Sequence, residues 1–285
     1  MFVHQTTVLL KTPADTDKAL NAEVKQQTGI HFRRVNRFIL LALYGAHQCA
    51  PTQELDPTTG IWLTTQNGTV SDTEKGLDQL FNQHIYPKPY NFINTMSNTA
   101  SFYIAQSLKL NSPNMTISCK DFAFERGLTL ARLDLRRGAV TGALIGGADE
   151  AAYSDANLKS RYADCLRDGS AWLYASNKAD QAIGEIKGIG DFENRDRAMA
   201  WLEKAALPLD PVFAFGARVP EEEYAVWLAQ RPESERFDYI AAYGYFDSAP
   251  AAGICLFFQK FKNRTCIHVN RDLNGQYGLV VVEVF

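Results

Sequence analysis

The sequence has no uninterrupted apolar run long enough to cross a bilayer, so we expect no membrane-spanning helix. It has no excess of basic residues either, because 29 Lys and Arg stand against 32 Asp and Glu, for a formal net charge of −3. A chain with this balance has no general attraction for a phosphate backbone, so a nucleic-acid partner is not expected. Residues 1–5 are not a basic segment followed by an apolar one, and we predict no secretion signal.

Cysteine and histidine are also scarce. The five cysteines are widely spaced, odd in number and free of any C-x-x-C pair, which argues against a zinc site or a redox motif. We therefore predict reduced, largely buried thiols in a cytoplasmic protein, with neither a metal nor a cofactor. The cysteines are Cys49, Cys119, Cys165, Cys255 and Cys266. The histidines are His4, His31, His47, His84 and His268.

What the sequence does contain is the composition of an ordinary globular protein. Hydrophobic residues make up 46% and charged residues 21% of its 285 residues, which is typical of globular domains. A chain of this length can bury a large core or fold as two fused halves. The basic cluster of Arg33, Arg34 and Arg37 is interpreted as the solvated face of a helix.

Hydrophobic periodicity predicts two passes of one α/β pattern. In the first pass the strands are expected at 6–10, 61–65, 115–119, 140–147 and 170–175, with helices at 32–47, from 71 onward and at 122–137. In the second pass the strands are expected at 183–189, 212–215, 239–242, 266–270 and 278–284, with helices at 194–205, 220–230 and 249–260. Both passes read βαβαβαββ, which predicts two halves, 1–180 and 181–285, packed as one unit.

Three helix ends have their own sequence signals. Ser71, with Glu74 three residues later, predicts a capping box, and Asn98 is expected to cap an additional helix. Two arginines followed by Gly138 predict the end of the helix at 122–137, since basic residues and glycine favour helix C-termini.

Several short motifs follow one another in the first half. They are Pro89–Phe92 with Met96–Asn98, then Leu144–Glu150, then Asp168–Ala171. In this order and spacing they resemble the N-terminal half of the β-ketoacyl synthases, a family with the thiolase fold. The resemblance implies that the two halves form a layered α/β/α/β/α sandwich, although the second half is shorter than in a complete ketosynthase.

In that family a catalytic cysteine lies at the turn into a buried helix, where the helix dipole favours a thiolate and backbone N–H groups stabilise an oxyanion. The resemblance places Asp121 at this position, at the start of the helix expected at 122–137. A carboxylate cannot form the acyl thioester of the condensation, and its simplest role is a helix cap worth about 1 kcal/mol. Cys119 is expected to be a buried structural thiol one strand step before the turn.

The family also uses two histidines to stabilise an enolate. The resemblance places Phe215 where the first histidine would be and Asp247 near the position of the second. The glycine-containing turn at 273–278 also differs from the gating loop of active members. We therefore predict that the chain has no catalytic activity on its own.

The resemblance then implies a chain length factor. Such a subunit pairs with an active ketosynthase, as a heterodimer or a dimer of heterodimers, and shapes the tunnel in which the chain grows on an acyl carrier protein. We expect the carrier protein to be reached through the ketosynthase. The compact second half resembles the truncated subunits of bacterial aryl polyene pathways. The expected tunnel or interface residues, for which ordinary core packing is the alternative, are Phe122, Phe124, Phe102, Tyr103 and Asn98.

Two other functions stay open. The chain could be an enzyme, either a diverged acyl transferase or short ketosynthase acting through Cys119, or a hydrolase acting through Asp121. Neither residue has a histidine nearby in the sequence to act as a base. The other alternative is a homodimer that binds acyl chains.

Overall fold

The structure is a computed structural model that describes residues 1–51, 55–231 and 233–285. In these residues the strands are β1 (Phe2–Lys11), β2 (Gly60–Thr65), β3 (Asn114–Ser118), β4 (Gly142–Asp149), β5 (Asp168–Ser176), β6 (Gly184–Phe192), β7 (Val212–Phe215), β8 (Glu235–Arg236), β9 (Arg264–Arg271) and β10 (Tyr277–Val284). The α-helices are α1 (Asp17–Thr28), α2 (Arg37–Cys49), α3 (Val70–Phe81), α4 (Pro89–Asn94), α5 (Asn98–Leu108), α6 (Ala123–Arg136), α7 (Ala156–Arg161), α8 (Arg195–Lys204), α9 (Glu221–Leu228), α10 (Tyr239–Tyr243) and α11 (Ala249–Lys260). Two short 3-10 helices are η1 (Ala151–Tyr153) and η2 (Ala163–Cys165).

The strand order shows an internal symmetry. The strands hydrogen-bond in the order β3-β2-β4-β5-β1-β6-β10-β9-β7-β8, so the first five and the last five follow the same order outward from the centre. Strand directions match as well, because β2 runs parallel to β3 and β4 just as β7 runs parallel to β8 and β9. The predicted βαβαβαββ pattern of both halves is confirmed.

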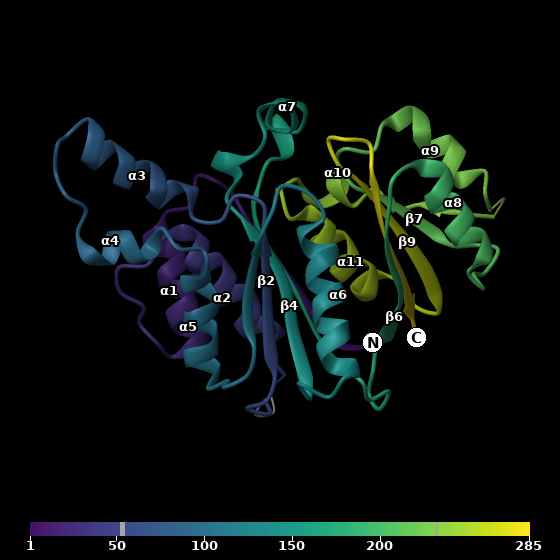
Figure 1. Cartoon of the computed structure of the whole chain (residues 1–285), viewed down its shortest axis with the longest axis horizontal. Helices are drawn as coiled ribbons and strands as arrows, with labels where there is room; N and C mark the ends of the chain where they lie inside the picture. The colour runs from purple at the N-terminus through teal and green to yellow at the C-terminus, as the bar shows by residue number, and fades with distance from the viewer. Residues whose placement is uncertain (52–54, 232) are drawn as a thin grey trace.

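The two half-sheets enclose a central layer of helices, α6 and α11 (Figure 1). α6 contacts β2 and β4 on one side and β6 and β10 on the other, while α11 contacts β1, β4, β5 and β9. Helices α1, α2 and α5 lie outside the N-terminal half-sheet, and α8 and α9 lie outside the C-terminal one. This arrangement confirms the α/β/α/β/α sandwich.

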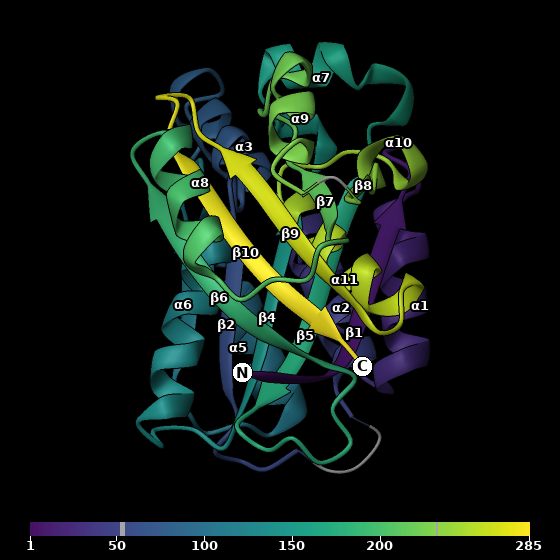
Figure 2. The same ribbon diagram turned by 90° about the vertical axis from the view of Figure 1, so that its right-hand side faces the viewer.

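The half-sheets are joined where β1 pairs with β6. Phe2 lies opposite Glu185 and Val3 opposite Gly184, so this ladder is short. Figure 2 shows the C-terminal half-sheet face-on, with α8 across β6 and β10. Because the join is confined to the strand ends, the two half-sheets can diverge and leave room for the central helices between them.

Three hydrophobic clusters account for the layers. One fills the space around the central helices, and the other two lie under the outer helices of each half. Every residue of β2 and of β4 is buried, as expected for parallel strands covered by helices on both faces. A Cβ on Gly147 in β4 would collide with Ser248 and Ala251, so the glycine in this motif lets α11 approach the sheet closely.

Both predicted N-terminal helix caps are wrong. α3 begins at Val70, and the hydroxyl of Ser71 donates instead to the Oε1 atom of Glu150 over 3.0 Å. Asn98 is the first helical residue of α5 and follows the N-cap residue Ser97. At Ser71 the hydrogen bond to Glu150 takes the place of the local capping contact.

The segment predicted as a strand at 239–242 is helix α10. The carboxylate of Asp238 accepts a hydrogen bond from the backbone N–H of Ala241 over 3.1 Å and caps this helix. The third strand of the second half is instead β8, a short strand that begins four residues before the predicted one. Helix α1 was not predicted from the periodicity.

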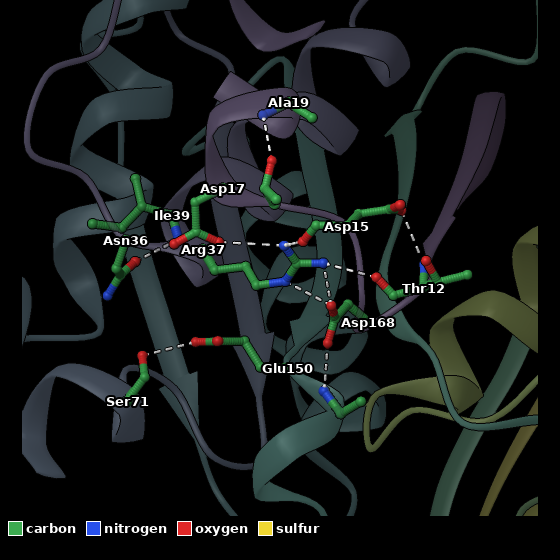
Figure 3. Close-up of polar contacts among 12 residues, drawn as sticks. Thr12, Asp15, Asp17, Ala19, Asn36, Arg37, Ile39, Ser71, Glu150 and Asp168 are labelled. Atoms are coloured by element: carbon green, nitrogen blue, oxygen red, sulfur yellow. Dashed lines mark hydrogen bonds and ion pairs between the residues drawn. The ribbon is translucent and has the colours of Figure 1, made fainter. Parts of the chain in front are cut away.

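Arg37 does not lie on a solvated face. Its guanidinium Nε donates to Asp168 Oδ2 over 2.6 Å, while Nη1 and Nη2 donate to the carbonyl oxygens of Asp15 and Thr12 (Figure 3). The side chain is only 10% exposed. Arg37 therefore holds the start of α2 against the start of β5, whereas the other two arginines of the cluster are exposed.

Candidate functional site

The two central helices begin at one small cavity. Asp121 and Asp247 each lie two residues before the first helical residue, of α6 and α11 respectively, and both line this cavity. Arg218, which follows β7, also lines it, as do Gln66 and Tyr245. The cavity volume is about 20 Å³, which is enough for a single water molecule. The structure therefore brings together two of the three predicted positions.

Asp121 is held by an ion pair. Its Oδ1 atom lies 3.3 Å from Nε of Arg218, whose Nη2 atom lies 3.8 Å from Oδ2 of Asp155. Burial raises the pKa of Asp121, and the nearby guanidinium opposes this shift. The residue at the turn itself is Phe122, in the left-handed region at φ 57°, and no side chain caps α6 there. The predicted capping role of Asp121 is therefore wrong.

Asp247 is held by neutral donors. Its side chain accepts from the Tyr245 hydroxyl over 2.6 Å and from the Asn67 side-chain amide over 2.5 Å. Its main-chain carbonyl accepts from the side-chain amide of Gln66. The residue is 2% exposed, so this carboxylate depends on hydrogen bonds rather than on a neighbouring cation.

A third carboxylate, Asp149, lies behind the cavity at the end of β4. It accepts from the Thr65 hydroxyl over 2.6 Å, from the backbone N–H groups of Gln66 and Asn67, and from the Ser248 hydroxyl. Burial, with a smaller contribution from the Asp247 charge, raises its pKa to about 7. The sequence contained it within the glycine-rich motif, but no signal there showed its hydrogen-bonding role.

Phe215 is not part of the cavity. Its ring packs on the outer side of β7 against Tyr224, with ring centroids 4.2 Å apart and planes 11° apart. Ala217 and Arg218, just beyond the strand, line the cavity instead. Arg218 was not predicted as a site residue, because nothing in its local sequence indicates which carboxylate it pairs with.

Cys119 is half-buried rather than buried, so the expectation of a fully buried thiol is wrong. Its Sγ atom donates to the carbonyl oxygen of Asp121 over 3.3 Å, and burial raises its pKa. Within the described residues no histidine is hydrogen-bonded to it. All five cysteines are free; Cys49, Cys255 and Cys266 are buried, while Cys119 and Cys165 are half-buried.

The expected tunnel or interface residues divide into two groups. Phe122 and Phe124 are 3% and 2% exposed. Phe124 packs within the central core, and the ring of Phe122 lies beside Gly278 of β10. Phe102 is 56% exposed, and Asn98 is exposed near it on α5. Tyr103 is half-buried and its ring lies against those of Phe102 and Phe32. None of the five lines the cavity at Asp121.

Exposed apolar side chains are frequent between α3 and β3. They extend from α3 and α4, which project from the body in Figure 1, to α5 and the edge strand β3. We call this surface the edge face; its residues are Leu77, Leu80, Phe81, Ile85, Tyr86, Phe92, Ile93, Met96, Phe102 and Met115. Exposed apolar side chains close to an edge strand are typical of a protein interface.

Across residues 1–51, 55–231 and 233–285, no helix has the length and apolar character that crossing a membrane requires. The same stretches contain no group of three or more His, Cys, Asp or Glu side chains placed to hold a metal ion.

The layers, the symmetric strand order and the cavity at the start of α6 define the chain as a protein of the thiolase-like α/β fold. No protein-family profile matches the sequence, and no curated protein matches it. The likeness to solved structures is therefore one of fold.

Two similar structures span the whole chain with a TM-score of 0.72. One is the ishigamide ketosynthase/chain length factor, at 14% identity, covering 100% of this chain and 99% of that chain. The other is a type II polyketide synthase acyl-carrier protein in complex with its ketosynthase bound to the hexaketide, at 13% identity and with coverage of 100% and 99%. Ketosynthase twelve of the bacillaene polyketide synthase of Bacillus amyloliquefaciens matches at 12% identity with a TM-score of 0.69, covering 100% of this chain and 73% of that chain. The predicted ketosynthase-like fold is confirmed.

Proposed function

We propose that this chain is a non-catalytic chain length factor, which pairs with an active β-ketoacyl synthase in the cytoplasm and shapes its acyl tunnel during chain elongation. The observation that carries the proposal is the small cavity at the start of α6, with an ion pair beside it. Where a ketosynthase needs a thiolate, Asp121 and Arg218 form an ion pair, and the space beside them accommodates about one water molecule.

The chemistry of the cavity also opposes condensation. A decarboxylating condensation develops negative charge on an enolate, which must be stabilised by donors that are free to act. Here the nearest side chains include two carboxylates, Asp121 and Asp247, and the Arg218 cation is already paired. A carboxylate cannot hold an acyl thioester, and further negative charge nearby disfavours an enolate.

The edge face supports a heterodimer. It includes Met115 on β3 and Phe102 on the adjoining α5, and the outer edge of β3 is unpaired within the described part of the chain. Solved structures of the same fold include one titled a ketosynthase/chain length factor and one of an acyl-carrier protein with its ketosynthase. We infer a heterodimer, or a dimer of heterodimers, with an active ketosynthase that in turn recruits the acyl carrier protein.

We further propose that the product is a conjugated polyenoyl chain of the aryl polyene type. This step rests on the likeness of the compact C-terminal half to the truncated subunits of those pathways. The accessible residues through which this chain could bound the partner's tunnel are Phe102 and Asn98, with Tyr103 behind them. Phe122 and Phe124 would act on the tunnel only through the packing of α6.

Pairing is tested first. Co-expression with a complete ketosynthase encoded beside this gene should yield a stable complex by size-exclusion chromatography. Phe81→Glu, at a residue that is 71% exposed on the edge face, should weaken that complex about tenfold or more. Leu209→Glu, at a residue 65% exposed in the C-terminal half, is the matched control and should leave it intact. A homodimer with no affinity for the ketosynthase would instead favour the acyl-binding alternative.

Tunnel control is tested in the assembled complex. Phe102→Ala should lengthen the product, because removing a ring at the interface leaves room for further extension units. Leu133→Ala, at a residue 54% exposed on α6 and outside the edge face, should not change product length. Unchanged length in the Phe102 variant at full assembly would count against a tunnel wall at α5.

The enzyme alternative is tested on the isolated chain with malonyl and acyl thioesters. We expect no decarboxylation and no covalent adduct on Cys119, because its pKa is raised by burial and no base is hydrogen-bonded to it among the described residues. A trapped acyl group on Cys119 or Asp121 would contradict the proposal.

A further inference from the structure

A second pocket lies behind Phe215, on the outer side of β7. Its volume is about 220 Å³. Four aromatic residues from four different segments line it, namely Tyr162, Phe215, Tyr224 and Phe237. An apolar cavity of 150 Å³ holds benzene, so this pocket has room for one six-membered ring with a small substituent.

The rings that line this aromatic pocket also pack against other side chains. Phe215 and Tyr224 stack with centroids 4.2 Å apart, and the Arg236 guanidinium lies 4.4 Å from the centre of the Tyr224 ring. Tyr162 stacks on Tyr245 at 4.7 Å, with planes 24° apart. Side chains restrained in this way need little rearrangement to receive a ligand, which is typical of a preformed small-molecule site.

The charges at the pocket cancel. Arg236 pairs with Asp238, and Nη2 of Arg161 lies 2.8 Å from Oε1 of Glu221. Two cations and two anions are therefore already matched, so no side chain remains to balance a charged ligand. The pocket favours a neutral molecule.

Two phenol hydroxyls remain available. Burial raises the pKa of Tyr162 to about 12 and also raises that of Tyr224, so both hydroxyls keep their protons at neutral pH. Among the described residues neither hydroxyl forms a hydrogen bond. Each can therefore donate to an oxygen on a ligand.

We propose that the aromatic pocket binds a neutral, monocyclic aromatic molecule whose carbonyl or hydroxyl oxygen accepts a hydrogen bond from Tyr162 or Tyr224. The rings of Phe215 and Phe237 supply offset or edge contacts to the ligand ring. This site is separate from the cavity at Asp121 and does not depend on the chain being a chain length factor.

The pocket is tested with acetophenone and two matched analogues. The full chain should bind acetophenone at one saturable site in calorimetry or ligand-observed NMR. Cyclohexyl methyl ketone, which lacks the aromatic ring, and benzoate, which is charged, should each bind about tenfold or more weakly. Equal affinity for the cyclohexyl analogue would overturn the proposal, because the aromatic lining would then select nothing.

Two exposed alanines on α10 provide a variant and its control. Ala241 lines the pocket, whereas its neighbour Ala242 does not, and both are exposed. Ala241→Trp should fill the pocket and reduce acetophenone affinity about tenfold or more, while Ala242→Trp should leave it unchanged. Equal loss of affinity in both variants would overturn the assignment. If the chain binds no acetophenone but self-associates, and Ala241→Trp abolishes that self-association, a protein side chain fills the pocket instead and the proposal is overturned.

Cys165, a half-buried residue lining the pocket, gives an independent readout. Saturating acetophenone should slow the alkylation of Cys165 by iodoacetamide. Peptide mass mapping measures the rate of this alkylation. Cys119, which is also half-buried but lies at the start of α6, should react at the same rate with or without the ligand. Saturable binding that leaves Cys165 as reactive as before would overturn this location for the site.

Discussion

Asp121 and Asp247 occupy matching positions in the two halves, yet their carboxylates are stabilised in different ways. Asp121 is half-buried and paired with the Arg218 cation, whereas Asp247 is 2% exposed and accepts only from neutral donors. A half-buried carboxylate can be balanced by one neighbouring cation, but a fully buried carboxylate without a cation needs several fixed hydrogen bonds. The comparison teaches that Asp247 is fixed by several hydrogen bonds that support the fold, while Asp121 is held by a single ion pair.

The largest effect should come from Asp247→Ala. It would leave the Tyr245 hydroxyl and the Asn67 amide buried without their partner, and we expect a loss of about 3 kcal/mol in the free energy of unfolding. Urea denaturation of the purified chain measures this. Asp247→Asn keeps the shape and one acceptor oxygen and should cost clearly less. If Asp247→Ala costs no more than Asp121→Ala, the proposed difference between the two aspartates is wrong.

The next-largest effect is a pH dependence of stability, which comes from the third residue of only one central helix. This residue is Glu125 in α6, whereas the matching residue in α11 is Ala251, which does not titrate. Glu125 is 1% exposed, accepts from the Asn270 amide over 3.0 Å, and has its pKa raised by burial from 4.5 to about 7. The folded state therefore holds this proton more tightly than the unfolded chain does. Its contribution to stability is complete below pH 4.5 and is lost as the pH rises to about 7.

Glu125→Gln removes this titration while keeping an acceptor for Asn270. At pH 8 the variant should be more stable than the original chain by roughly 2 kcal/mol, and near pH 4.5 the two should be equal. Asp149 and Glu150, whose pKa values burial also raises to about 7, shift stability in the same direction and remain in both proteins. An unchanged slope of stability against pH in the variant would show that Glu125 does not titrate in this window.

A smaller effect is expected at the ion pair. Arg218→Met should lower the free energy of unfolding by about 1 kcal/mol. The two side chains are only 12% and 19% exposed, but the Asp121 carboxyl that remains can take up a proton. Thermal denaturation measures this change. The variant should also raise the pKa of Asp121 further, since the guanidinium favours the charged carboxylate. A loss as large as that of Asp247→Ala would show that Asp121 is structural as well.

The smallest effect should follow Asp121→Cys. This variant supplies a thiol at the position proposed for the nucleophile but neither imidazole, and the cavity still holds only about one water. We expect no decarboxylation of malonyl thioester, measured by carbon dioxide release. Condensing activity in this single variant would show that the rest of the active site has been retained.

Much of the fold could be predicted because its signals are local. Strand β7 and helix α11 match the predicted ranges residue for residue, since each is an almost continuous apolar run with polar or turn residues at its ends. The segment at 239–242 failed because its aromatic and β-branched residues favour a strand, while the Asp238 cap decides for a helix. The site was predicted in part: Asp121 and Asp247 come together, but Phe215 faces a different pocket.

The order of residues along the chain determined the doubled βαβαβαββ pattern, the helices that become central, and the absence of a nucleophilic cysteine at the turn into α6. These features depend on neighbouring residues, so they can be read without knowing the fold. Only the tertiary structure decided that Arg218 pairs with Asp121, that the charges of Asp149 and Asp247 lie close enough to interact, and that Arg37 is buried against Asp168. Each of these pairings joins segments far apart in sequence, and their distance is set by the packing of the two half-sheets around α6 and α11, which no local pattern encodes.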